Sequence, residues 1–146
     1  MVSLYGECLC GVVKYKYTGE TGQVINCHCS ECRKWHGAAY RTRTVGSKSK
    51  FVWVSGEDNV GRYEGQPNAI KTFCKECGSN LISLYKDNED LIGLPLGGIE
   101  GARSLKPTCH VFVDYKADWH SIEDDLPQHK ELPGDLSSIH TLTDKS

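Results

Sequence analysis

The sequence has no apolar run that approaches the ~18 residues of a membrane-spanning helix. Its first fifteen residues include acidic and basic side chains and no apolar stretch of signal-peptide length. It shows no low-complexity run, and no internal repeat beyond recurring cysteine turns. We therefore expect one soluble, cytoplasmic domain, because 146 residues are enough to bury a core of their own.

The chain also lacks the basic excess of a nucleic-acid-binding domain, since its formal net charge is −2. We expect no nucleic-acid partner and no membrane partner. The charge is unevenly distributed: residues 32–56 contain six basic and no acidic side chains, whereas residues 118–146 contain seven acidic and two basic ones. The basic stretch is either a solvated strand face or a region that attracts a small anion.

Cysteine, by contrast, is plentiful. Seven of the eight cysteines fall into three tight groups, which are Cys8 with Cys10, Cys27 with Cys29 and Cys32, and Cys74 with Cys77. In a reducing compartment such groups are more often metal ligands than disulfides, and partners one residue apart would form a strained bridge. Four plus three thiolates predict two Zn²⁺ ions per chain, one in a closed site and one in an open site.

The outer groups predict the closed, structural site. The two-residue gap between Cys74 and Cys77 lets both sulfurs face one ion, and Gly78 can take the positive φ that such a turn requires. Cys8 and Cys10 are a weaker signal alone, because alternate residues of a strand share a face and can simply be buried. Together the four sulfurs would join the N-terminal strand to the middle of the chain.

The triplet Cys27, Cys29 and Cys32 leaves one tetrahedral position to fill. Candidates from the sequence are water, a substrate thiol, His28, His36, His110 or Cys109. We favour an exchangeable ligand, because three protein ligands plus an open position is the usual catalytic arrangement. The alternatives for Cys109 are a fourth ligand or an inert core residue.

Most segments predict short strands separated by glycine or polar turns, so the fold should be mainly β. The expected strands cover residues 12–17, 50–54, 69–73, 80–85, 91–94 and 110–113. One short helix is expected, capped by Ser30 and stopped by Gly37, which places Cys29 and Cys32 at a helix start where thiolate charge is stabilised. Residues 1–122 form the predicted domain and 123–146 an acidic tail, part of which Leu126, Leu132 and Leu136 could pin to the body.

Four motifs occur in a fixed order: GECLCGVV at 6–13, CHCSECRK at 27–34 with Gly37 and Ala38, FCKECGSNL at 73–81, and Pro107 with HVFV at 110–113 and Trp119. Over about residues 5–122 the chain resembles the glutathione-dependent formaldehyde-activating enzyme family, which includes centromere protein V. The resemblance implies an Mss4-like, mainly antiparallel β fold with two zinc sites. It implies a structural ion on Cys8, Cys10, Cys74 and Cys77, and a catalytic ion on Cys27, Cys29 and Cys32.

The activity that the resemblance implies is carbon-sulfur lyase chemistry on a small anionic thiol such as glutathione and an aldehyde such as formaldehyde, through S-hydroxymethylglutathione. Arg33 and Lys34 are then expected to pair with substrate carboxylates. Trp35 and Tyr40 either line the pocket or pack in the core. His110 is either a proton donor to the product or a strand histidine with a satisfied hydrogen bond.

Two other functions are compatible with the same residues. The chain could be a non-catalytic module, stabilised by zinc, that binds a thiol or a protein partner. Alternatively Cys109 could be a redox-active thiol, since methionine sulfoxide reductases share the Mss4-like fold; that hypothesis requires an exposed Cys109 with a lowered pKa.

Overall fold

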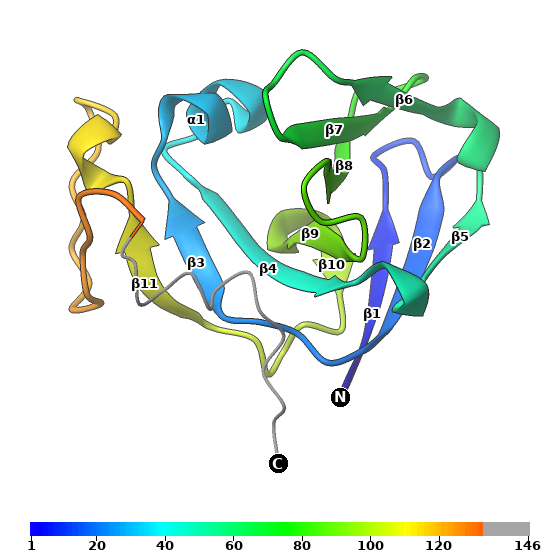
Figure 1. The fold of residues 1–146 in the computed structure, drawn as a ribbon, viewed down its shortest axis with the longest axis horizontal. Helices are drawn as coiled ribbons and strands as arrows, with labels where there is room; N and C mark the ends of the chain where they lie inside the picture. Colours follow the sequence, from blue (N-terminus) through cyan, green and yellow to red (C-terminus); the bar gives the residue numbers. More distant parts are fainter. Residues whose placement is uncertain (133–146) are drawn as a thin grey trace.

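The computed structural model describes residues 1–132, and most of these residues belong to two β-sheets (Figure 1). The smaller sheet has the strand order β10 (Ile99–Glu100), β1 (Val2–Glu7), β2 (Lys14–Gly19), β5 (Phe51–Ser55). The larger sheet has the order β11 (Pro107–Val111), β3 (Val24–Cys27), β4 (Arg41–Ser47), β9 (Leu91–Pro95), β8 (Asn80–Tyr85), β7 (Ala69–Cys74), β6 (Val60–Tyr63). The fold is therefore mainly β, as the sequence predicts.

Helical structure is sparse in the described part of the chain. The single α-helix there is α1 (Ser30–His36), which follows β3 directly. Short 3₁₀ turns are η1 (Lys48–Lys50), η2 (Glu57–Asn59), η3 (Leu96–Gly98) and η4 (Val113–Tyr115). No helix in residues 1–132 is long and apolar enough to cross a membrane.

The strands β1 and β2 show an alternation of exposed and buried residues. In β2, Tyr15 and Tyr17 are buried while Lys14 and Lys16 are exposed, as a half-buried strand requires. Neighbouring strands pair antiparallel throughout, except for β11, which runs parallel to β3. Figure 1 shows β4 as a long, curved strand that runs from α1 across the molecule.

The main core lies between the two sheets. It combines Leu4, Tyr15 and Tyr17 of the small sheet with Leu81 and Ile92 of the large one. The Tyr17 hydroxyl accepts a hydrogen bond from the Ser47 backbone N–H at 2.9 Å and donates to a backbone carbonyl, so this buried polar group is satisfied. A second, smaller apolar cluster beside β3 and β11 surrounds part of the cysteine triplet.

Several predicted element bounds change. The strand expected at residues 12–17 is β2, which covers 14–19. The strand expected at 110–113 is β11, which covers 107–111. The strand expected at 80–85 is confirmed as β8. The pattern did not reveal β3, β4 or β6. The sequence VINC of β3 carries no alternation, because all four of its residues are buried.

The chain beyond β11 lies along the outer side of that strand (Figure 1). The His110 N–H donates to the Pro127 carbonyl at 2.9 Å, and the His129 N–H donates to the His110 carbonyl at 2.9 Å. Leu132 packs against the small apolar cluster, as anticipated for a leucine that pins this segment. The domain boundary at residue 122 stays a prediction, and Leu136 lies outside the described residues.

Two candidate metal centres

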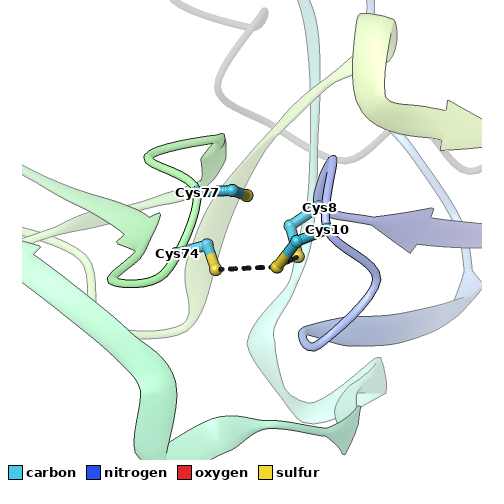
Figure 2. A group of neighbouring side chains, drawn as sticks. All are labelled: Cys8, Cys10, Cys74 and Cys77. Atoms are coloured by element: carbon cyan, nitrogen blue, oxygen red, sulfur yellow. Dashed lines mark hydrogen bonds between the residues drawn. The ribbon is translucent and has the colours of Figure 1, made fainter.

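The first candidate centre contains Cys8, Cys10, Cys74 and Cys77 (Figure 2). Their four sulfurs all lie within 4.8 Å of one another. The Sγ atoms of Cys8 and Cys10 are 3.6 Å apart, and those of Cys10 and Cys74 are 3.9 Å apart. Sulfurs at tetrahedral positions ~2.3 Å from one zinc ion would be separated by about 3.8 Å. The donor set therefore fits a closed tetrahedral zinc site.

Two turns build this centre from opposite sheets. One turn joins β7 to β8: Gly78 has φ 76°, and its N–H donates to the Cys74 carbonyl at 2.8 Å. The other follows β1, so Cys8 and Cys10 lie in a turn rather than on the strand that the alternation suggested. The Leu9 N–H donates to Ser79 Oγ at 2.8 Å and connects the turns directly.

Hydrogen bonds prepare part of this donor set for deprotonation. The Ser79 hydroxyl and backbone N–H stabilise the Cys77 thiolate and lower its pKa to about 5. The Val13 N–H donates to Cys8 Sγ at 3.2 Å. These donors orient the sulfurs, as partners behind metal ligands commonly do.

The second candidate centre contains Cys27, Cys29 and Cys32, whose sulfurs also lie within 4.8 Å of one another. Cys27 ends β3, and Cys32 is in the first turn of α1. The N-cap of α1 is Cys29 rather than the expected Ser30: the Cys32 N–H donates to Cys29 Sγ at 3.3 Å. Gly37 ends the helix with φ 59°, as expected from the sequence.

The Cys29 thiolate is stabilised by its surroundings. Its pKa is lowered because it accepts hydrogen bonds from the thiols of Cys27 and Cys32 and from backbone N–H groups at the helix start. The pKa of Cys27 is raised, because its proton is held in the hydrogen bond to Cys29. A divalent cation bound by all three sulfurs would displace the protons that remain on them.

Within residues 1–132 no fourth ligand atom joins the triplet. Cys109 is 3% exposed and packs beside Ile25 and Cys27, and burial raises its pKa. These are properties of a core cysteine and not of a redox-active thiol. His36 Nδ1 faces the Asn80 amide at 3.3 Å. Neither Cys109 nor His36 therefore adds a ligand atom to the triplet.

The pleat of the large sheet separates two sets of side chains. Cross-strand partners share a face, so Cys27 and its partner Arg41 lie on one side together with Ile25 and its partner Arg43. Asn26 and His110 lie on the other side. The triplet and the imidazole of His110 therefore belong to opposite faces.

On the triplet's face the sheet and α1 border a cavity of about 320 Å³ that is open to solvent on one side. All three triplet cysteines line it, along with Phe112 and Val111. Phe112 is held in the left-handed region at φ 58°, the one non-glycine residue with positive φ in the described chain. Such strain is common where a backbone is shaped for a site.

Three cations and one carboxylate line the same cavity: Arg41, Arg43, Lys71 and Glu31. The Lys71 ammonium is 2.7 Å from a Glu31 carboxylate oxygen and 4.4 Å from the centroid of the Trp35 ring. The Arg41 guanidinium lies 5.1 Å from the same ring and donates to Ser83. Trp35 thus holds two cations in place instead of lining the cavity itself.

The other substrate contacts expected from the sequence lie elsewhere. Arg33 Nε donates to the Tyr115 carbonyl at 3.0 Å, and Lys34 is exposed; neither lines the cavity. Tyr40 packs against His28 with the two rings tilted by 48° and their centroids 4.8 Å apart. The structure brings Arg41, Arg43 and Lys71 to the triplet instead, and the usable signal for the arginines was their alternation within the basic stretch that follows Cys32.

Two buried histidines and an exposed aspartate form a chain of polar contacts on the opposite face. His28 Nε2 and His110 Nδ1 are 2.8 Å apart, and His110 Nε2 is 2.9 Å from the Asp124 carboxylate. His110 is therefore a strand histidine with satisfied hydrogen bonds. Burial and the neighbouring His110 lower the pKa of His28 to about 4. This chain of contacts ties residues 124–129 to the loop that carries Cys27 and Cys29.

Comparisons with known proteins agree with these motifs. The model of the glutathione-dependent formaldehyde-activating enzyme family matches residues 3–115. An uncharacterized lyase of Schizosaccharomyces pombe is 28% identical over 113 residues, which cover 77% of this chain and 80% of that protein. A crystal structure of a Rhodobacter sphaeroides protein has a TM-score of 0.56 and 24% identity, covering 66% of this chain and 88% of that one. This last likeness concerns the fold alone.

Proposed function

Because the chain belongs to the glutathione-dependent formaldehyde-activating enzyme family, we propose that it is a zinc-dependent carbon-sulfur lyase for a small thiol and an aldehyde. The substrates we propose are glutathione and formaldehyde, or a closely related pair. The observation that carries the proposal is the three-cysteine group without a fourth ligand in residues 1–132, open to a cationic cavity. Cys27, Cys29 and Cys32 would hold the catalytic ion.

Zinc in this position would lower the pKa of an entering thiol and supply it as a thiolate. The reaction then needs no redox step: the thiol loses its proton, its sulfur bonds to the aldehyde carbon, the carbonyl π bond opens, and the oxygen takes up one proton in return. The reverse reaction cleaves the same carbon-sulfur bond. The chain's own contribution is to hold the reactants close together and to exclude water.

The residues around the triplet are suited to these tasks. Val111 and Phe112 form an apolar wall of the cavity, and this wall limits the access of water to the sulfurs. Hydrogen bonds from the thiols of Cys27 and Cys32, together with backbone N–H groups at the start of α1, lower the pKa of Cys29. Arg33 and Lys34 follow the last ligand directly, and their pairing with an outer carboxylate stays a prediction. A direct role for His110 is not part of the proposal, because His110 lies on the other face of the sheet.

The second centre has a structural task in this proposal. Cys8, Cys10, Cys74 and Cys77 would hold a zinc ion that connects the small sheet to the large one. All four tetrahedral positions are then protein sulfurs, which leaves no place for a substrate.

The proposal is tested by following ¹³C-formaldehyde exchange with S-hydroxymethylglutathione by NMR, since this reaction also proceeds without a catalyst. We expect metal-loaded protein to accelerate the exchange above the spontaneous rate. Cys29→Ser should abolish the acceleration, whereas the matched control Cys109→Ser should retain it because Cys109 is no ligand. Metal-loaded protein that leaves the spontaneous rate unchanged would favour the non-catalytic binding module instead.

A further inference from the structure

The side chains that line the cavity beside the triplet carry more positive than negative charge. Arg41, Arg43 and Lys71 line it, while Glu31 is the one carboxylate among the lining residues. Three thiolates around one Zn²⁺ ion would add a net charge of about −1. A single positive charge therefore remains in excess before any ligand enters, and it favours an anion over a neutral molecule.

Unpaired donors on the two arginines point to the same conclusion. Arg41 is 5% exposed and Arg43 is 6% exposed. Arg41 Nε and Arg43 Nη1 are buried and have no hydrogen-bond partner within residues 1–132. A buried donor that lacks an acceptor is costly, so these atoms suit a site where a ligand supplies the acceptor.

Two members of the cluster, Lys71 and Arg41, are held in place before a ligand arrives. Lys71 is fixed by its ion pair with Glu31 and by the face of Trp35. Arg41 is fixed by Trp35 and Ser83. Positioned donors bind an anion better than solvated ones, because less side-chain entropy is lost on binding.

We propose that Arg41, Arg43 and Lys71 form a carboxylate-binding pocket that makes the triplet site selective for thiols that carry a carboxylate. Guanidinium groups match the planar geometry of a carboxylate, and the cavity brings that pocket and the three cysteine sulfurs to one ligand. The inference rests on the proposed function only for the position of the thiol. Arg41 and Arg43 are specificity residues in this proposal, not groups that react.

The alternative is that the arginines only neutralise the cysteine thiolates. That role requires charge near the sulfurs but no free donor, and it predicts no preference between a charged and a neutral thiol. The unpaired Arg43 Nη1 and the excess of cations over Glu31 favour the ligand-binding role.

A matched ligand pair distinguishes the two roles without any mutation. In protein loaded with Co²⁺ the cysteine ligands already give a sulfur-to-metal absorption band, and coordination of an added thiol changes this band. Titration with 3-mercaptopropionate and with its neutral amide compares thiols of equal size. We expect the acid to bind roughly 10- to 100-fold more tightly, as a charge-assisted pair in a buried site allows, and the difference to shrink at high salt. Equal affinities would overturn the proposal.

Substitution then identifies the residues responsible. Arg43→Gln should remove most of the preference for the acid while leaving the affinity for the amide unchanged. Arg43→Lys should retain part of the preference, because lysine keeps the positive charge but lacks the two parallel N–H donors of a guanidinium. Arg62→Gln, an exposed arginine of β6 outside this cavity, is the matched control and should behave as wild type. An equal loss of affinity for acid and amide in Arg43→Gln would mean a merely structural role.

A third measurement separates this inference from the proposed function. S-methylglutathione has carboxylates but no free thiol, so its binding does not depend on coordination at the triplet. Saturation-transfer NMR should detect its binding to wild type and a weaker signal with Arg43→Gln. If no thiol alters the Co²⁺ spectrum while S-methylglutathione binds through Arg43, the thiol chemistry fails and the carboxylate pocket stands. If thiols coordinate without preference and S-methylglutathione does not bind, the pocket fails and the open metal site stands.

Discussion

The seven clustered cysteines differ in whether they hold the fold together or form the candidate catalytic site. Cys74 is fully buried at the end of β7 and faces a turn from the other sheet, so its sulfur joins distant parts of the chain. Cys29 is half-buried at the start of α1, where its neighbours Cys27 and Cys32 are close in sequence as well as in space. Loss of the first should therefore affect the fold, and loss of the second the site.

We expect Cys74→Ser to unfold or aggregate the protein, and Cys29→Ser to remain folded but lose thiol-dependent activity. A structural zinc site contributes on the order of 10 kcal/mol, which is comparable to the whole stability of a domain. Serine at position 29 keeps an oxygen that can cap α1. Thermal melts of the two variants check the prediction, and equal losses in Tm would indicate that the triplet is structural too.

His36 offers a pH-dependent prediction at the same scale. Burial, with Arg41 and Lys71 nearby, lowers its pKa to about 4. Because the folded state holds the imidazole neutral, its contribution to stability is complete above the ordinary pKa of 6.5 and decreases as the pH falls from 6.5 towards 4. The Tm of wild type should fall more steeply over this range than that of His36→Gln, as melts at matched pH would measure. Parallel curves would contradict the assignment.

Among the elements, β11 and the segment after it depend on a few specific contacts. The His129 N–H and the Asp124 carboxylate both bond to His110, which lies in β11. The hydrogen bond from His110 lowers the pKa of Asp124. This contribution is present at neutral pH and is lost as the pH falls through the lowered pKa.

Asp124→Ala should loosen this segment without unfolding the sheets. We expect faster hydrogen exchange at the backbone amides of His110 and Val113, which donate to carbonyls of residues 127 and 129. Asp125→Ala is the matched control, since Asp125 is an exposed neighbour, and its exchange rates should equal those of wild type. Unchanged protection in Asp124→Ala would show that the backbone bonds alone hold the segment.

For the whole molecule, the two candidate centres are expected to differ in lability. Four sulfurs from two sheets enclose one ion, whereas three sulfurs beside a cavity leave the other with a route for exchange.

We expect two zinc ions per chain and a mild chelator to remove one of them first, with the fold retained. Metal analysis and circular dichroism during the titration would follow the two steps. Cys29→Ser should contain one ion and lose it in a single step, together with its structure. Wild type that binds one ion, or loses two together on unfolding, would contradict the division into structural and catalytic sites.

The sequence alone determined the features that depend on local spacing. The three short cysteine groups, the helix after Cys29 and the strand at 80–85 follow from residues near one another in the chain, whereas the pairing of the two outer groups followed from the number of ligands that zinc needs. The family motifs are likewise local runs. Ligand geometry at a turn is fixed by a few backbone angles, such as those of Gly78, and these are encoded where they are used.

The tertiary structure alone decided which residues face the cysteine triplet. Arg33 and Lys34 were the expected anion partners because they follow Cys32 in sequence, yet Arg33 donates to a carbonyl of η4 and Lys34 is exposed. Arg41 reaches the triplet because β4 pairs with β3 in a register that sets it opposite Cys27. Lys71 arrives from β7, three strands further across the sheet. Strand register and sheet curvature are set by packing across the whole core, and no short stretch of sequence specifies them.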